Sequence, residues 1–298
     1  MKISVIIVTY NAAKHIKECV KSLIDNASRD IPFEIVVVEN ASSDETVAIL
    51  DKMITAYPQT IKMLLQNTNY GFSKGCNIGA RDASGEILVF INPDTVCLTK
   101  NWNSIILDRH DSHSITGFQF RFPDGFQQYS IGQFPTSIWR IVFDRLPLTR
   151  IWLGVLVRHR SYYESSKKVD WVCGCGFAID KEVFESLGGF DDNIFMYWDE
   201  TDLCYRAQQQ GISTFYIPYV QFIHIEEGDS FHRKPQKMYQ IRKNLIYLFQ
   251  KYDLPITLFL FKIILFLETG LRLIVAYAAN ISKDRKIFVL KTFSLVFT

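Results

Sequence analysis

The sequence predicts an α/β protein in which a mostly parallel, Rossmann-like sheet is flanked by helices, and three observations lead to this fold class. Four short runs rich in β-branched residues have the composition of strands buried on both faces. Helical patterns follow these runs, and such alternation builds parallel sheets with right-handed crossovers. Hydrophobic residues make up 48% of the 298 residues, so the chain can bury a large core and is not disordered.

The first two strand–helix units follow one another directly. A strand is expected at Ile3–Thr9, which is too short to be a signal or membrane-spanning segment. The helix after it has apolar residues one turn apart at Ile16, Val20, Leu23 and Ile24. A second strand at Glu34–Val38 leads into a helix that Asp44 or Ser43 caps and that continues through residues 53 and 54.

The third and fourth strands are separated by a glycine-rich stretch. The third strand is expected at about Ile61–Leu65, and a helix is expected after the stretch Gly71–Gly79. The fourth strand, Ile87–Ile91, runs straight into Asn92-Pro93-Asp94. The glycines allow a close backbone approach, but their spacing is not the dinucleotide G-x-G-x-x-G fingerprint, so an NAD role is weakly supported.

The pattern is less regular in the second half of the chain. Residues 123–168 are rich in aromatics and arginine and are interpreted as an insertion or a lid. Regular patterns then predict a strand at 169–172, a helix from Lys181, a turn at 188–191, a helix at about 200–209, and strands near 213–217 and 220–224.

The C-terminal tail differs from the rest in charge and in hydropathy. Residues 231–298 carry a net charge of +9 and residues 1–230 a net charge of −7, although the whole chain is only +2. Residues 255–281 are the most apolar segment, and Lys262, Glu268 and Arg272 interrupt them. This pattern favours helices that lie on a membrane surface or pack on a partner, the last of them at about 286–297. A helix that spans the membrane is the less favoured interpretation. Nucleic acid is not expected, because no binding motif accompanies the charge.

Cysteine usage indicates a reducing compartment. The six cysteines show neither a C-x-x-C pair nor a zinc-like cluster, and they are Cys19, Cys76, Cys97, Cys173, Cys175 and Cys204. Because we expect no signal peptide before the first strand, they are interpreted as reduced, cytosolic thiols.

Polar residues end three of the expected parallel strands, where ligands of such sheets bind. They are Thr9–Asn11, Glu39–Asn40 and Asn92–Asp94. A carboxylate such as Asp94 can hold Mg²⁺ or Mn²⁺ against a diphosphate, although Asn, Pro and Asp also form ordinary turns. His224 ends a later strand and is either a structural histidine or a further ligand beside Asp94.

An acidic cluster follows an aromatic run at a predicted helix start. Asp199, Glu200 and Asp202 can be favourable charges against the helix dipole. An apolar wall formed by Tyr197 and Trp198 would instead raise the pKa of a carboxyl group and prepare a general base. Asp202 and Arg206 are four residues apart, so one can orient the other across a helical turn.

The order and spacing of these motifs form one recognisable series. The series is VTYN at 8–11, VVEN at 37–40, NxGFxxGxNxG at 69–79, NPD at 92–94, GGFD at 188–191 and WDETDLCYR at 198–206. Over about residues 1–250 the chain resembles the family 2 glycosyltransferases, and most of all their rhamnosyltransferase-like branch. The chain departs from the usual pattern at Glu39, at Asn92 and in the order Asp199-Glu200.

The resemblance implies a GT-A fold and an inverting, metal-dependent transfer from a nucleotide-sugar, with rhamnose favoured, to a hydroxyl of a glycan acceptor that is lipid-linked. It assigns the base to Glu200, or to Asp199 because their order is reversed, and it assigns Mg²⁺ or Mn²⁺ to Asp94 and His224. The implied donor-site residues are Thr9, Asn11, Glu39, Asn40, Asn69, Gly71, Phe72 and Asn77. Trp171 and Trp198 are expected as aromatic platforms for a sugar face, and Asp202 as a further substrate-site residue.

The resemblance, together with the charge and hydropathy of the tail, predicts a division of the chain and a location. Residues 1–230 would be the catalytic domain, with a nucleotide-binding half at about 1–110 and an acceptor-side half at about 111–230. Residues 231–298 would attach the protein peripherally to the inner face of the cell membrane, and a homodimer is left open. The alternatives are a non-catalytic nucleotide-sugar-binding scaffold and a sugar nucleotidylyltransferase, for which the basic, glycine-rich phosphate loop is missing at the N-terminus.

Overall fold

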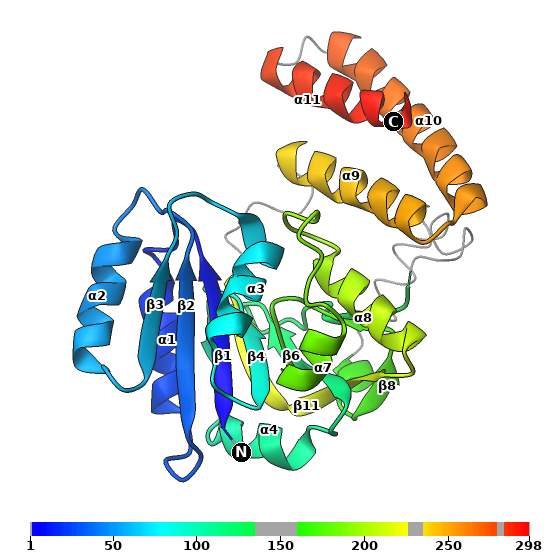
Figure 1. Ribbon diagram of the computed structural model, residues 1–298. Coiled ribbons are helices and arrows are strands. Elements are labelled where there is room, and N and C mark those ends of the chain that lie inside the picture. Colours follow the sequence, from blue (N-terminus) through cyan, green and yellow to red (C-terminus); the bar gives the residue numbers. More distant parts are fainter. Residues whose placement is uncertain (1, 135–159, 226–234, 279–282, 298) are drawn as a thin grey trace. The chain divides into compact units, whose positions relative to one another are not determined.

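The structure is a computed structural model that describes residues 2–134, 160–225, 235–278 and 283–297. The chain divides into two compact units. Among the described residues, the first unit holds the sheets with their helices, and the second holds the C-terminal helices (Figure 1).

The first half of the main sheet is parallel, as predicted. It consists of β1 (Ile3–Thr9), β2 (Phe33–Glu39), β3 (Ile61–Leu65) and β4 (Ile87–Ile91), in the order β3-β2-β1-β4. All side chains of β1 and β4 are buried, which explains their continuous apolar runs. The strands end together at one edge of the sheet, because all of these pairings are parallel.

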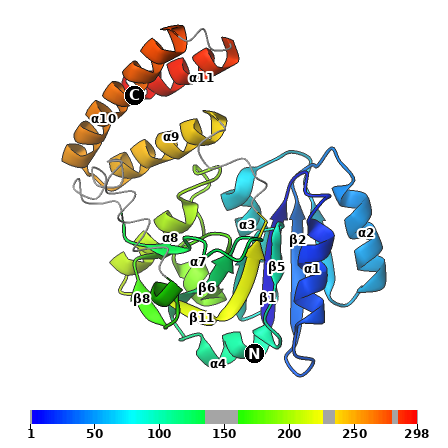
Figure 2. The same cartoon turned by 180° about the vertical axis from the view of Figure 1, so that it is seen from behind.

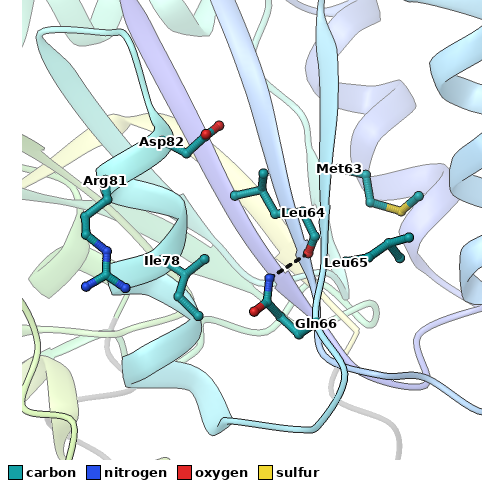
Figure 3. Close-up of a pocket in the computed structure, with 7 residues that line it drawn as sticks. All are labelled: Met63, Leu64, Leu65, Gln66, Ile78, Arg81 and Asp82. Atoms are coloured by element: carbon teal, nitrogen blue, oxygen red, sulfur yellow. Dashed lines mark hydrogen bonds between the residues drawn. The ribbon is translucent and has the colours of Figure 1, made fainter.

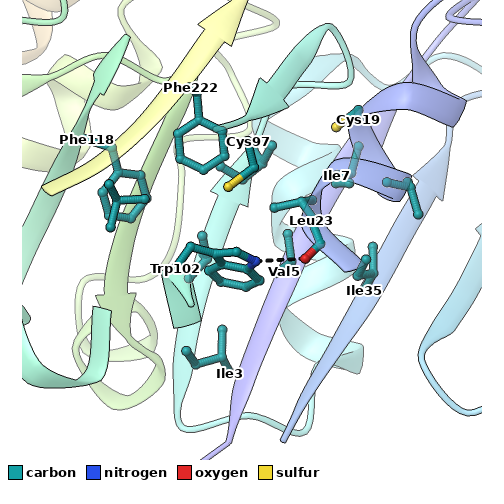
Figure 4. Packing of buried hydrophobic residues seen from close by; sticks show 14 of the residues in the cluster. Ile3, Val5, Ile7, Cys19, Leu23, Ile35, Cys97, Trp102, Phe118 and Phe222 are labelled. Carbon is teal, nitrogen blue, oxygen red and sulfur yellow. Dashed lines mark hydrogen bonds between the residues drawn. The ribbon is translucent and has the colours of Figure 1, made fainter. Parts of the chain in front are cut away.

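Helices cover both faces of this parallel half (Figures 1 and 2). Ile3, Val5 and Ile7 of β1 belong to one buried cluster with residues of α1 (Ile16–Asp25), and α2 (Thr46–Ala56) contributes Leu50 and Met53 to it. In the same cluster the indole N–H of Trp102 donates a hydrogen bond to the carbonyl of Leu23 (Figure 4). The N-cap of α2 is Glu45, not the expected Asp44 or Ser43, but Asp44 still accepts the backbone N–H of Thr46, the first residue of the helix.

The opposite face is covered by α3 (Gly71–Asp82), and here the sequence-based expectation was wrong. The glycine-rich stretch does not precede the helix but forms it. A Cβ on Gly75 would lie 2.7 Å from Val8 Cγ1, and one on Gly79 would lie 2.6 Å from Ile6 Cγ2. The glycines therefore let the helix pack closely on β1, with two of them one turn apart on its sheet-facing side.

The second half of the sheet is mixed in direction. β10 (Gly176–Asp180) runs antiparallel to β4 and to β6 (Ser114–Arg121), and β6 runs parallel to β11 (Ser213–His224). The strands expected at 213–217 and 220–224 are one strand, with an irregularity where it pairs with β6. The other elements that the structure describes in the first unit are β5 (Thr95–Cys97), α4 (Trp102–Arg109), β7 (Ile131–Gly132), the short 3₁₀ turn Arg160–Tyr163, β8 (Lys167–Val169), β9 (Trp171–Val172), α7 (Lys181–Ser186) and α8 (Asp199–Gln209).

Residues 123–172 include part of the expected insertion and the expected strand at 169–172. Residues 135–159 of the expected insertion lie outside the described residues. The strand expected at 169–172 is divided between β8, which pairs with β11, and β9, which pairs with β7 in a separate small sheet. The break at Asp170 sends the two short strands to different partners.

The described residues of the second unit form α9 (Pro235–Lys251), α10 (Pro255–Ala278), α11 (Lys283–Ser294) and the short 3₁₀ turn Leu295–Phe297. A salt bridge of 2.6 Å joins Arg242 of α9 to Glu268 of α10, and Arg272 lies 2.9 Å from the same carboxylate. Within the described residues, no helix has the length and apolarity that crossing a membrane requires.

Candidate active site

The carboxyl edge of the sheet collects the polar residues that the sequence analysis selected. β1, β2 and β4 end there at Thr9, Glu39 and Ile91. Because β10 is antiparallel to β4 and places Gly176 opposite Ile91, the turn before β10 reaches the same edge. β11 ends beside it, with His224 paired to Thr95 of β5. Residues from six separate strands thus converge on one edge.

Asp94 and His224 meet there, as the sequence analysis proposed. His224 Nε2 lies 3.3 Å from Asp94 Oδ1, and His224 is buried whereas the Asp94 side chain is 29% exposed. The other ring nitrogen, Nδ1, lies 3.0 Å from Gln128 Oε1 and 2.9 Å from Gln128 Nε2. When Nδ1–H donates to that oxygen, the lone pair of Nε2 faces the Asp94 carboxylate. The site thus presents one carboxylate oxygen and one imidazole nitrogen side by side.

This pair fits a divalent cation in chemistry and in spacing. Mg²⁺ prefers oxygen ligands at about 2.0–2.1 Å in octahedral geometry, which puts neighbouring ligands about 3 Å apart. The 3.3 Å between Asp94 Oδ1 and His224 Nε2 is close to that spacing. Among the described residues, no cluster of three or more His, Cys, Asp or Glu side chains is arranged to hold a metal ion.

The turn Cys173-Gly174-Cys175 lies against both halves of the site. Cys175 Sγ is 3.4 Å from His224 Nδ1 and 2.9 Å from Cys173 Sγ. A Cβ on Gly174 would lie 3.5 Å from Glu200 Oε2. The turn therefore brings His224 and Glu200 close to the same short segment.

Asp199 and Glu200 begin α8 after two residues in the left-handed region. Tyr197 and Trp198 have φ of 73° and 69°, a strained backbone that persists only where its surroundings hold it. Burial, followed by the neighbouring Asp199 carboxylate, raises the pKa of Glu200 well above its usual range. Burial also raises the pKa of Asp199. A carboxyl group with a raised pKa is a stronger base once it is ionised, and a general base has this property.

The predicted donor-site residues at the ends of β1 and β2 are held by local contacts. Glu39 is buried and accepts the N–H of Ser42, and Asn11, with φ of 51°, accepts the N–H of Ser43. Asn40 is buried and donates to the carbonyl of Gly71. Thr9 Oγ1 and Asn40 Oδ1 are buried atoms without a hydrogen-bond partner among the described residues. Such atoms are costly unless a ligand or water satisfies them.

The start of α3 is held in place by the loop that leads to α8. Gly71 has φ of +83°, and a Cβ there would lie 2.5 Å from the Phe195 carbonyl oxygen. That oxygen accepts the N–H of Phe72, whose ring packs edge-on against Phe190. Asn69 accepts the Gly71 N–H and so shapes the same turn. These contacts tie the donor-site motif to the segment that carries Glu200.

Asn77 and Asp202, which the resemblance implied as substrate-site residues, both make hydrogen bonds within the protein. The Asn77 amide accepts the Phe190 N–H and donates to the Phe190 carbonyl. Asp202 is buried and pairs with Arg206 Nε at 2.8 Å, which confirms the expected contact across a helical turn. Arg206 also donates to the carbonyl of Gly189. Three of the sequence motifs are therefore joined in one network that positions the loop before α8.

The two expected aromatic platforms differ in their surroundings. The indole N–H of Trp171 donates to the carbonyl of Gln133, and its ring lies edge-on to Tyr129. Trp198 is half-buried and directly precedes Asp199. Trp198 is thus the aromatic side chain adjacent in the chain to the carboxyl pair.

Sequence reasoning missed three members of the site. No pattern around Gln128 indicates that it belongs to the site, because its partner His224 lies at the end of β11, far along the chain. Cys173 and Cys175 were noted only as lacking a C-x-x-C spacing, whereas a C-G-C turn before a buried strand could have indicated them. A separate pocket lies between β3 and α3 (Figure 3), and its lining contains none of the candidate site residues: Met63, Leu64, Leu65, Gln66, Ile78, Arg81 and Asp82.

Solved structures share this fold. GalNAc-T7, crystallised with UDP, GalNAc and Mn²⁺, superposes with a TM-score of 0.61 at 19% identity, over 82% of this chain and 47% of that one. The mannosyltransferase PcManGT from Pyrobaculum calidifontis, crystallised with GDP-Man and Mn²⁺, gives a TM-score of 0.58 at 17% identity, over 99% of this chain and 86% of that one. The predicted fold class is confirmed as GT-A.

Curated relatives are similar over about three quarters of the chain. RfbC, an O-antigen biosynthesis protein of Myxococcus xanthus, is 25% identical over 76% of this chain, which spans only 17% of that protein. The rhamnosyltransferase WbbL of Escherichia coli K12 is 25% identical over 81% of this chain and 94% of its own length. The N-acetylglucosaminyl-diphospho-decaprenol L-rhamnosyltransferase of Mycobacterium tuberculosis H37Rv is 24% identical over 74% of this chain and 75% of its own length.

The family itself is settled by the region that contains the parallel half of the sheet. The family described as glycosyl transferase family 2 matches residues 4–188, which run from β1 through the turn at Gly188 and include Asp94. The motif series, the fold and this match agree, and the chain belongs to glycosyl transferase family 2.

Proposed function

We propose that this chain is an inverting, metal-dependent glycosyltransferase that moves a sugar, with rhamnose favoured, from a nucleoside-diphosphate donor to a hydroxyl of a lipid-linked glycan. One observation carries the proposal. The Asp94–His224 pair and the Glu200 carboxyl group both lie beside the Cys173–Cys175 turn at the carboxyl edge of the sheet. A leaving diphosphate and an attacking hydroxyl need two such groups on opposite sides of one sugar carbon.

The chemistry follows from these two groups. The acceptor oxygen attacks the anomeric carbon as the bond from that carbon to the diphosphate oxygen breaks. Ionised Glu200 takes the proton of the acceptor hydroxyl, and the nucleoside diphosphate leaves with the bonding electrons. One displacement inverts the configuration of that carbon. No bond between the sugar and the protein is formed.

Asp94 and His224 are the residues that would hold the divalent cation. A bound Mg²⁺ or Mn²⁺ supplies positive charge that stabilises the departing diphosphate. Both GalNAc-T7 and PcManGT were crystallised with Mn²⁺, which supports this assignment. Gln128 holds the His224 ring by its other nitrogen, so that Nε2 stays directed toward Asp94.

Glu200 is preferred over Asp199 as the base because of its accessibility. Asp199 is only 3% exposed, whereas Glu200 is half-buried. A base must come within hydrogen-bonding distance of the acceptor hydroxyl, and this requires an accessible carboxylate. Asp199 then acts on Glu200 by raising its pKa.

The proposed donor site comprises the strand ends and the start of α3. Thr9, Asn11, Glu39 and Asn40 would face the base and ribose, and the unsatisfied buried oxygens of Thr9 and Asn40 support this placement. Asn69, Gly71 and Phe72 would shape the same pocket, with Trp198 as an aromatic platform beside the carboxyl pair. Rhamnose and a lipid-linked acceptor are proposed because WbbL is named a rhamnosyltransferase and the Mycobacterium tuberculosis relative is named for a diphospho-decaprenol substrate.

The proposed division of the chain assigns catalysis to residues 1–230 and attachment to residues 231–298. The tail, with its net charge of +9, would hold the protein peripherally at the inner face of the cell membrane. This location would place the catalytic domain near an acceptor that is anchored in the same membrane.

A donor panel with purified protein tests the proposal. Release of nucleoside diphosphate is measured for each nucleotide-sugar with an acceptor glycolipid extract, with Mn²⁺ or Mg²⁺ and again with chelator. We expect turnover with one donor, its loss with chelator, and inversion at the anomeric carbon by NMR. The variant Glu200→Gln should lose about 10²–10⁴-fold in rate and keep donor binding. Glu185→Gln, an exposed glutamate on α7, is the matched control.

The outcomes separate the proposal from the alternative. Donor binding by thermal shift without any turnover, in wild type and Glu200→Gln alike, would favour the non-catalytic scaffold. Full activity of Glu200→Gln would move the base elsewhere. Turnover that chelator leaves unchanged would contradict the metal assignment.

A further inference from the structure

One face of α10 exposes an unusual amount of apolar surface. The exposed fractions are 73% for Ile256, 64% for Phe259, 64% for Leu267, 63% for Leu271 and 68% for Ile274. Two further exposed residues, Ile263 and Phe266, lie between them. The spacing of three or four residues places all seven on one side of the helix, and we call them the α10 stripe.

The opposite face of α10 is already used for packing. Thr257, Phe261, Leu265 and Thr269 are buried and follow one another at intervals of four residues. Phe261 packs edge-on against Phe249 of α9. The α10 stripe is therefore a second apolar face. At its edge Phe266 packs on Phe293 of α11, with ring centroids 5.3 Å apart, and the other six residues of the stripe are exposed. Isolated exposed leucines are common on protein surfaces, but a continuous patch of this kind marks an interaction site.

The charge of the surrounding tail selects the occupant. Residues 231–298 carry twelve Lys or Arg against three Asp or Glu. Of those acidic residues, Glu268 is engaged by Arg242 and Arg272. A second copy of the chain would bring two tails of net charge +9 together, which is unfavourable at short range. An anionic lipid surface offers apolar depth beside negative headgroups and complements both features.

We propose that the α10 stripe docks on the surface of an anionic lipid bilayer, with α10 lying in the plane of the interface. This rests on the proposed function, which assigns membrane attachment to residues 231–298, and it names the face of the tail that makes the contact. From Ile256 to Ile274 the stripe is about 27 Å long at 1.5 Å per residue. Its aromatic and aliphatic side chains enter the boundary between headgroups and acyl chains, and lysines such as Lys243 and Lys291 remain at the headgroups.

Vesicle co-sedimentation of the full chain tests this inference. The vesicles are phosphatidylcholine alone, or phosphatidylcholine with phosphatidylglycerol. We expect wild type to bind the anionic vesicles and to bind neutral ones much less. Leu267→Gln with Leu271→Gln should weaken binding to anionic vesicles at least about tenfold, because two leucines no longer enter the bilayer. Leu65→Gln with Leu98→Gln makes the same chemical change at exposed leucines of the first unit and should bind like wild type.

A second pair of variants separates charge from apolar contact. Lys243→Gln with Lys291→Gln removes two exposed lysines of the tail and should reduce the preference for anionic over neutral vesicles. Far-UV circular dichroism and the melting temperature establish that each variant is folded.

Three outcomes would overturn the inference. In the first, the Leu267→Gln, Leu271→Gln variant binds anionic vesicles as well as wild type does. In the second, wild type binds neutral vesicles as well as it binds anionic ones. The third is a wild-type dimer in solution that binds no vesicles and that the leucine variant converts to a monomer, because the occupant would then be a second copy. Nucleoside diphosphate release is measured on the same preparations without vesicles. Its absence would count against the proposed function and not against the stripe.

Discussion

At the scale of single residues, the candidate site depends on groups that set the state of their neighbours. Gln128 is buried and touches no expected substrate position, but its amide lies against His224 Nδ1. The proton of a neutral imidazole resides on the nitrogen that donates a hydrogen bond. When Gln128 Oε1 accepts the Nδ1 proton, Nε2 offers a lone pair beside Asp94.

The variant Gln128→Leu should weaken Mn²⁺ binding about 10–100-fold, the usual effect of losing such an orienting contact. Isothermal titration of Mn²⁺ into the protein with a nucleoside diphosphate measures the change. Gln119→Leu removes a buried glutamine amide that bonds to Gln127, and it serves as the control. Equal weakening in both variants would indicate a general loss of packing and would count against a specific role for Gln128.

The raised pKa of Glu200 predicts the pH dependence of activity. The base acts when ionised, so the rate rises as Glu200 loses its proton, and the raised pKa places this rise above the usual glutamate range. The neighbouring Asp199 carboxylate is the second cause of that shift. In Asp199→Asn the rise should therefore move to lower pH. The rate of donor turnover measured as a function of pH checks this. An acidic limb that is unchanged in Asp199→Asn would show that another group controls the rise in rate.

The same shift predicts a gain in stability when the acid is removed. Because the pKa of Glu200 is raised on folding, its stabilising effect is complete below the unfolded pKa of about 4.3 and is lost as pH rises through the folded pKa. Glu200→Gln should therefore melt at a higher temperature than wild type at pH 8, and the difference should shrink toward pH 4. Scanning calorimetry at both pH values decides this. A variant that is less stable at pH 8 would contradict the raised pKa.

At the scale of elements, close packing of α3 on the sheet positions the donor-site motif. Gly75 and Gly79 bring the helix axis near β1, and the turn at Gly71 receives the loop that leads to Glu200. Asn77, on the same helix, holds Phe190 of that loop. A helix displaced from the sheet would therefore disturb both sides of the site.

The variant Gly75→Ala should destabilise the protein by about 1–3 kcal/mol, because the new methyl group would overpack against Val8. The matched change Gly270→Ala is also inside a helix, and a Cβ there meets nothing within 4 Å. It should instead stabilise α10 by up to about 1 kcal/mol. Urea unfolding of both variants gives the comparison. A Gly75→Ala variant as stable as wild type would show that α3 can shift without cost.

The elements that the sequence could predict share one property. β1, β2, β3 and β4 are short runs rich in apolar residues beside helical patterns, so local composition is sufficient to find them. β6 and β10 were missed because glycine, threonine and polar residues interrupt them, and because their partners are distant in sequence. The glycine-rich stretch was taken for a loop, since local propensity disfavours glycine in helices and the packing on Val8 is not visible in the sequence.

The same limit explains which site residues were found. Asp94 and His224 could be paired because each ends an apolar run and the family pattern connects them. Gln128 and Cys175 reach His224 through the order of β10, β6 and β11, and no periodicity in the chain encodes that order. Asn77 and Asp202 were expected at the substrate because they lie in recognisable motifs, and the contacts of both with the loop before α8 could not be predicted from those motifs.

At the scale of the whole molecule, opposite charges are segregated along the chain. Residues 1–230 carry −7 and residues 231–298 carry +9, so the near-zero total conceals two strongly charged parts. An anionic surface attracts the tail and repels the body. The protein can thus be held at a membrane without its acidic body being drawn onto the headgroups.

This segregation predicts how membrane binding responds to salt. The Debye length falls from about 10 Å at 0.1 M to about 3 Å at 1 M, so added salt should screen the attraction of the lysines and arginines. Burial of the α10 stripe is apolar and is not screened. Binding of wild type to anionic vesicles should therefore fall steeply as salt is added and then level off. Binding of the Leu267→Gln, Leu271→Gln variant should lie below this level and continue toward zero. Co-sedimentation across a salt series measures both curves. If the two curves coincide at 1 M salt, attachment is electrostatic alone, and the exposed face of α10 has some other occupant.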